Sequence, residues 1–188
     1  MQRSRILPLL AALALGLAAC ATTPSGMLAP DAPRALTAQG PVSVAWADPA
    51  GFTEFRFSGN RWAAAQGNWL QDLAEYMRKR AEQQLPAGHH LELTIVDLTR
   101  AGQYEPWRDP QMQDARIVRD IYPPRMTVEF RQLDAAGKVV AEGERKITDQ
   151  AFLTNASPMH GNDPLRFEKR MVDSWLRREF RDAATAAR

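Results

Sequence analysis

The chain has 188 residues, with 24 Lys and Arg side chains against 22 Asp and Glu, three histidines and a single cysteine. A formal net charge of only +2 argues against a nucleic-acid-binding domain, which needs a clear excess of basic residues. One cysteine excludes an internal disulfide framework, so a hydrophobic core must hold the fold together. The length is sufficient for one such core.

The first 19 residues have the pattern of a secretory signal peptide. Arg3 and Arg5 precede an apolar stretch over 6–19, which is shorter than the ~20 residues that span a bilayer. An uncleaved membrane helix is the alternative, and this short length disfavours it. The stretch closes on Leu17-Ala18-Ala19-Cys20, the pattern of a bacterial lipobox. We therefore expect Cys20 to be a lipid attachment site.

The lipobox also predicts where the protein resides. By resemblance to bacterial lipoproteins, Cys20 would carry several acyl chains such as palmitate, enough for stable anchoring. Ala21 follows it, where an aspartate is associated with retention at the inner membrane. This favours the periplasmic side of the outer membrane in a Gram-negative bacterium. Removal of residues 1–19 would leave 22 basic and 22 acidic residues, so we expect no nucleic-acid partner.

Residues 20–40 follow the predicted cleavage site and have the composition of a linker. They are rich in Pro, Ala, Thr, Gly and Ser and show no hydrophobic periodicity. Such a flexible tether reaches ~60 Å when it is extended. We expect residues 41–188 to form a single domain beyond it.

The domain begins with a strand pattern and a helix pattern. Residues 42–46 alternate between apolar and small or polar side chains, which predicts a short strand. Residues 61–84 predict one helix, because Trp62, Trp69 and further apolar residues recur at spacings of three and four. We expect both tryptophans to lie in the core. Pro86 ends the helix.

The second half of the domain predicts three more strands and a helix. Residues 90–98 alternate as a strand, and the polar segment 101–116 predicts an irregular loop. Residues 125–133 and 138–147 form a hairpin pattern around a turn that contains a glycine. The last helix begins near Asp163 with an apolar stripe. The order predicts an α+β fold, with a small antiparallel sheet of about four strands and two helices packed on one face.

Several short motifs in this domain resemble a family of bacterial envelope proteins known as domain of unknown function 3016. The resemblance covers about residues 42–180. It implies an exported single-domain lipoprotein and implies no catalytic residues. Its motifs are Asp48-Pro49, Phe52-Thr53-Glu54, Leu85-Pro86-Ala87-Gly88, Leu91 to Asp97, Ala101-Gly102, Glu105-Pro106, Arg119-Asp120, Pro123-Pro124-Arg125, and Phe167 to Met171 with Trp175.

Asp97 is the first candidate for a functional residue. It is in phase with the apolar residues of its predicted strand, and a carboxylate on the core side needs a partner. Arg119 and Arg125 are the candidate partners, and Asp120 lies beside them. A structural ion pair, or a bulge that turns Asp97 to solvent, is the more common outcome. A carboxylate with a perturbed pKa is the functional alternative.

The loop that follows Asp97 supplies two further candidates, Tyr104 and Trp107. Aromatic side chains on a polar loop serve either as contact anchors or as a lid folded onto the core, and we expect the lid. His89 and His90 are adjacent on a strand and point to opposite faces, so no metal site and no cofactor is predicted.

Three functional hypotheses remain. The first is a non-enzymatic binding or accessory module with an envelope protein partner, held to the membrane through Cys20. The second is an envelope hydrolase that uses Asp97, Arg119 and Arg125. The third is a carrier of a small ligand, which needs a cavity of ~300 Å³ between helices and sheet.

Overall fold

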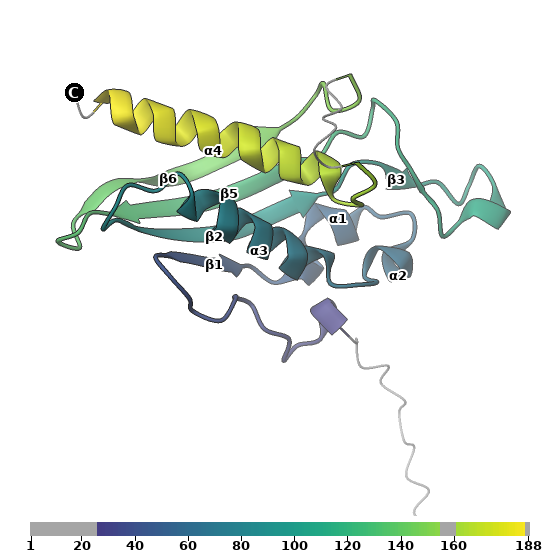
Figure 1. Ribbon diagram of the computed structural model, residues 1–188. Helices are drawn as coiled ribbons and strands as arrows, with labels where there is room; N and C mark the ends of the chain where they lie inside the picture. Colours follow the sequence, from purple (N-terminus) through teal and green to yellow (C-terminus); the bar gives the residue numbers. More distant parts are fainter. Residues whose placement is uncertain (1–25, 155–160, 187–188) are drawn as a thin grey trace, which may run out of the picture.

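A four-stranded sheet with two long helices on one face forms the body of the protein (Figure 1). The computed structural model describes residues 26–154 and 161–186, with side chains up to Phe180, so the predicted signal peptide and Cys20 lie outside the described residues. The sheet order is β1 (Val42–Trp46), β2 (His90–Thr99), β5 (Arg125–Leu133) and β6 (Val139–Thr148). The covering helices are α3 (Trp69–Glu82) and α4 (Arg166–Ala186). The predicted fold class is confirmed.

The direction of β1 differs from the prediction of an antiparallel sheet. β1 runs parallel to β2, whereas β2, β5 and β6 form antiparallel pairs. The reason is the α3 crossover, which carries the chain back along the sheet before β2 begins. The hairpin between β5 and β6 is confirmed, with Gly137 at a φ of +79° in its turn.

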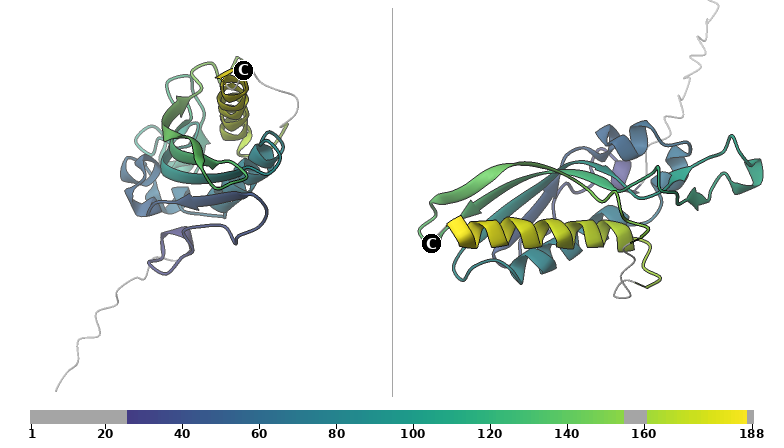
Figure 2. Two further views of the ribbon diagram at one scale, coloured as in Figure 1. Left: turned by 90° about the vertical axis from the view of Figure 1, so that its left-hand side faces the viewer. Right: turned by 90° about the horizontal axis from the view of Figure 1, so that it is seen from above.

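The core lies between the sheet and the two helices. The helices α3 and α4 lie on one face of the sheet (Figure 2). Alternate strand residues turn inward and pack against the apolar stripes of these helices, while charged residues such as Glu129 and Arg131 are exposed on the other face. The buried residues include Leu91, Leu93, Ile95, Met126, Val128, Phe130, Leu73, Met77, Val172 and Leu176. No helix in residues 26–154 or 161–186 combines the length and the apolarity needed to cross a bilayer.

The helix predicted over residues 61–84 is broken in two. A short helix, α2 (Arg61–Ala64), is capped by the Asn60 side chain and ends before Gly67, whose φ of +76° is unfavourable for other residues. α3 starts afresh at Trp69. Trp69 is buried as predicted, but the core position predicted for Trp62 is wrong, because its side chain is 68% exposed.

The loop predicted over 101–116 has structure of its own. β3 (Gln103–Tyr104) and β4 (Arg116–Ile117) pair with each other, and a 3-10 turn, η3 (Pro110–Met112), lies between them. We call residues 103–117 the arm, because they project beyond the end of the sheet that is farther from the C terminus (Figures 1 and 2). Helix α1 (Thr53–Arg56) lies at the same end.

Residues 26–40, predicted to be part of a flexible tether, instead lie along the open edge of β1, and we call them the strap. The backbone N–H of Leu36 donates to the Val44 carbonyl at 2.9 Å, and that of Trp46 donates to the Arg34 carbonyl at 2.8 Å. The Arg34 guanidinium donates to the Met27 carbonyl at 3.0 Å. The strap starts with the 3-10 turn η1 (Gly26–Leu28), which lies close to η2 (Pro49–Gly51). The tether prediction is therefore wrong for these residues.

Candidate functional site

Asp97 caps a helix instead of pairing with an arginine. Its carboxylate accepts hydrogen bonds from the Thr53 backbone N–H at 2.6 Å, the Thr53 hydroxyl at 2.7 Å and the Leu98 N–H at 2.9 Å. The register of β2 shifts between Ile95 and Asp97, and this irregularity moves the carboxylate out of the core to a half-buried position. Asp97 therefore holds the start of α1, where the N–H groups of a helix need acceptors.

The other predicted site residues do not converge on Asp97. Arg119 pairs with Glu105 at 3.2 Å, and Asp120 is exposed and accepts from the backbone N–H of Ile121. Arg125 lines a surface groove of about 330 Å³ that Asp97 also borders, but no ion pair joins the two side chains within the described part of the chain. The alternative in which Asp97 pairs with Arg119 or Arg125 is therefore wrong, whereas the alternative of a bulge beside Asp97 agrees with the register shift in β2.

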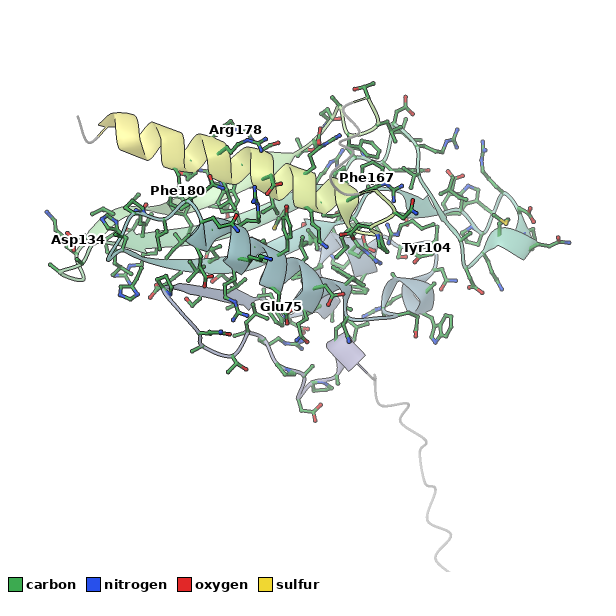
Figure 3. All side chains as sticks on the ribbon, in the orientation of Figure 1. Glu75, Tyr104, Asp134, Phe167, Arg178 and Phe180 are labelled. Carbon is green, nitrogen blue, oxygen red and sulfur yellow. The ribbon has the colours of Figure 1, made fainter. Side chains whose placement is uncertain are left out.

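Tyr104 and Trp107 have opposite environments on the arm. Tyr104 is buried at the base of the arm, where Figure 3 labels it, and the Arg116 guanidinium lies 4.8 Å from its ring centre. Trp107 is 66% exposed. The predicted lid is confirmed for Tyr104 and wrong for Trp107.

Trp107 is one of eight large apolar side chains that are exposed among the described residues, and four of the eight come from two neighbouring segments. Phe57 is 65% exposed, Trp62 68%, Trp107 66% and Met112 48%. We call these four residues the aromatic surface. They come from two segments, 57–62 and 107–112, at the end of the molecule that carries the arm (Figure 1).

Direct contacts hold these two segments side by side. The Gln103 side-chain amide donates to the Phe57 carbonyl at 3.3 Å, and the Asn60 amide donates to the Gln113 carbonyl at 3.1 Å. Gly59 lies so close to the arm that an added Cβ would be 2.2 Å from the Tyr104 carbonyl oxygen and 3.0 Å from the Trp107 ring. Only glycine fits there without displacing the arm.

A buried ion cluster fixes the frame beneath the aromatic surface. Glu54, on α1, is only 4% exposed and accepts from the Arg100 backbone N–H at 3.0 Å and from the Arg100 guanidinium at 3.0 and 2.8 Å. It also accepts from Arg116 on β4. The Arg100 guanidinium lies 4.1 Å from the Trp69 ring centre. This cluster joins α1, the end of β2 and the arm through charge-assisted hydrogen bonds.

A second carboxylate, Glu105, holds the outer half of the arm. It is 5% exposed and accepts from the Tyr122 hydroxyl at 2.7 Å and from Arg119 at 3.2 Å. The Tyr122 hydrogen bond, followed by the Arg119 charge and hydrogen bond, holds the pKa of Glu105 below its usual value.

Glu168, at the start of α4, is the most buried carboxyl group beside this frame, with 1% of its surface exposed. Its Oε1 atom accepts from the Ala101 N–H at 2.6 Å, while Oε2 and the Arg116 Nε atom have no hydrogen-bond partner among the described residues. Burial raises the pKa of Glu168, although the charges of Arg100 and Arg116 oppose the shift.

The residues that sequence reasoning missed are Glu54, Arg100, Arg116, Glu105, Phe57 and Met112. Glu54 and Arg116 are 62 residues apart in the chain, so no local pattern predicts their contact. A local signal existed for Phe57, which follows the Phe52-Thr53-Glu54 motif as an apolar residue outside any predicted helix or strand. In the described part of the chain, no group of three or more His, Cys, Asp and Glu side chains could hold a metal ion.

Comparison with known proteins places the chain in a family. No curated protein sequence matches it. One solved structure that matches is described as "a putative lipoprotein from Caulobacter crescentus CB15"; it is 21% identical, with 60% of this chain and 81% of that chain covered and a TM-score of 0.35. The family model described as "Protein of unknown function (DUF3016)" matches residues 40–178, which include all four strands of the main sheet. Because this match spans well over half of the sequence, the chain belongs to the DUF3016 family.

Proposed function

We propose that this protein is a lipid-anchored component of the cell envelope that acts by binding and not by catalysis. Cys20 holds it on the periplasmic side of the outer membrane, and the aromatic surface is its contact surface. The observation that carries this proposal is the exposure of two tryptophans, a phenylalanine and a methionine on one firmly held frame.

Two features of the aromatic surface support a binding role. Tryptophan, methionine and arginine are enriched at protein contact surfaces, and large exposed apolar side chains that lie together commonly mark interaction sites. The Glu54 and Glu105 clusters hold both contributing segments in place before a partner arrives, which lowers the entropy cost of binding.

The alternative of a hydrolase has less support. It required Asp97, Arg119 and Arg125 to act together. Instead, Asp97 accepts hydrogen bonds from Thr53, and Arg119 forms an ion pair with Glu105. The carrier alternative required a cavity between helices and sheet, where side chains such as Leu73, Met77 and Leu176 are fully buried.

The test places a photo-crosslinking amino acid at Trp62 or at Trp107 in living cells. Val140, which is 48% exposed on the edge strand β6, is the matched control position. We expect adducts from positions 62 and 107 and none above background from position 140. Equal background labelling at all three positions would remove the aromatic surface as the contact surface. Fractionation of the Cys20→Ser variant tests the anchor, because it should release the protein from the outer membrane.

A further inference from the structure

We propose that the aromatic surface rests in the headgroup region of the same membrane that holds the lipid anchor. This inference rests on the proposed function, since it names the occupant of the proposed contact surface. Three observations carry it: the short reach left between Cys20 and the domain, the side chains of the aromatic surface, and the charges around that surface.

The strap limits how far the domain can stand from the bilayer. The chain packs against the core from Met27 onward and is hydrogen-bonded to β1 at Arg34 and Leu36, so Gly26 lies at the surface of the domain and only six peptide units separate it from Cys20. A fully extended chain of that length reaches about 20 Å, a third of the reach expected for a tether that ends at residue 40. The body of the domain must therefore lie next to the membrane surface.

The strap also determines which end of the domain lies nearest to the anchor. Gly26 borders the same groove as Asn68, which follows α2 and precedes α3. Figure 1 shows η1, α1 and α2 gathered at the end of the molecule that carries the arm, while the C terminus lies at the other end. The aromatic surface, which starts at Phe57 after α1 and includes Trp62 on α2, is thus at the anchored end.

The side chains of this surface suit a membrane interface. Tryptophan and other aromatic rings prefer the headgroup region, where an apolar ring can be buried while its polar edge stays hydrated. Arg56 lies 5.3 Å from the Phe57 ring centre, and both Arg56 and Arg61 are exposed and form no ion pair with a described residue. Their guanidinium groups are available for lipid phosphates.

The acidic side chains of the arm do not oppose this contact strongly. Asp109 accepts from the Gln111 N–H at 2.9 Å, and Asp114 accepts from the Asn60 amide at 2.8 Å. Both carboxylates thus turn toward the protein's own hydrogen-bond donors. In addition, the anchor makes the second contact intramolecular, with an effective concentration of roughly millimolar, so a weak affinity for lipid is sufficient.

The experiment uses the acylated chain in vesicles of phosphatidylethanolamine and phosphatidylglycerol. Because Cys20 is the only cysteine, a cysteine introduced elsewhere is the only free thiol after acylation. Gln111→Cys places an environment-sensitive fluorophore beside Met112 and leaves the aromatic surface intact. Ala136→Cys, in the hairpin turn beside Asp134 at the opposite end of the molecule (Figure 3), is the control.

We expect the fluorophore of Gln111→Cys to emit at shorter wavelength in vesicles and to resist quenching by iodide several-fold better than that of Ala136→Cys. Adding Trp62→Ser and Trp107→Ser should abolish the difference while circular dichroism stays unchanged. Shielding that occurs only in native membranes, and not in pure lipid, would overturn the lipid occupant and identify a protein partner. Equal quenching at both positions in vesicles and in native membranes would overturn the proposed contact surface as well.

Discussion

The Glu54 cluster allows a quantitative prediction about how the arm is held. Glu54→Gln keeps the shape of the side chain but leaves the Arg100 and Arg116 guanidinium groups without a counter-charge. Their side chains are 14% and 17% exposed, so water compensates only in part. Removal of one partner from a buried ion pair costs about 3–5 kcal/mol.

The contacts that remain place the expected cost at the lower end of that range. Arg100 keeps its hydrogen bond to the Ala64 carbonyl at 3.0 Å and its contact with the Trp69 ring, and Arg116 keeps the Gly102 carbonyl at 2.9 Å. We therefore expect a loss of about 3 kcal/mol in the free energy of unfolding. In a protein of this size, that loss lowers the melting temperature by roughly 6–12 °C.

The measurement is urea unfolding followed by circular dichroism, on mature chains that all carry Cys20→Ser. The matched control is Glu142→Gln, which breaks an ion pair with Arg131 at 3.7 Å on the exposed sheet face, where the side chains are 64% and 51% exposed. That pair should contribute about 0–1 kcal/mol. If Glu54→Gln costs no more than Glu142→Gln, the buried cluster does not hold the frame and the reasoning is refuted.

Three further predictions concern the same region. Gly59→Ala should cost about 1–3 kcal/mol of unfolding free energy and expose the arm to proteolysis, because the added Cβ collides with a backbone carbonyl. The control is Gly51→Ala, whose Cβ meets no atom within 4 Å. Equal melting temperatures of the two variants would contradict the prediction. Burial raises the pKa of Glu168, so the stabilising effect of the protonated carboxyl group is present in acid and is lost as the pH rises from about 4.5 through the raised pKa. The melting temperature of Glu168→Gln relative to the wild type should therefore increase with pH. A difference that stays constant with pH would refute this prediction. Tyr122→Phe removes the main cause of the lowered pKa of Glu105. A carboxylate with a lowered pKa stabilises the fold above its unfolded-state pKa, and this stabilisation is lost in acid, so the variant should lose more stability at neutral pH than in acid. A difference in melting temperature that does not shrink in acid would argue against the prediction.

The sheet could be predicted because its signal is local. Alternation along 125–133 and 138–147, with a glycine in the turn, specified the hairpin to within one residue of β5 and β6. The parallel direction of β1 does not follow from the strand pattern, because short strands carry no mark of direction. It was missed although the helix predicted between the first two strands indicates a crossover connection. Only the crossover helix determines it.

Errors at the candidate site have two physical sources. In the sequence, Trp62 continues the apolar spacing of α3. In the structure, the positive φ of Gly67 interrupts the helix between Trp62 and α3, and the Trp62 side chain is exposed. Asp97 finds its donor in Thr53, 44 residues earlier, and this contact depends on how α1 packs onto β2. The periodicity of a sequence predicts which face of a helix or strand is buried, but it does not predict which residues of two separate elements come into contact.

The strap was missed for a different reason. Its contacts with β1 are made by backbone N–H and C=O groups, which are the same for every residue except proline. A segment rich in proline and alanine therefore has the composition of a linker while two hydrogen bonds and Arg34 hold it on a sheet edge.

The pairing of the strap with β1 lies in the path of any force that acts between the proposed anchor and the domain. In a chain anchored at Cys20, such a force would enter the domain at Gly26. It would load the Arg34 hydrogen bond to the Met27 carbonyl first, then the two backbone hydrogen bonds to β1, and then the Arg78 hydrogen bond to the Thr37 carbonyl at 3.1 Å. Complete release would free the 15 residues of the strap, whose fully extended length is about 50 Å. The strap would therefore give way before the pairing of the four-stranded sheet is disturbed.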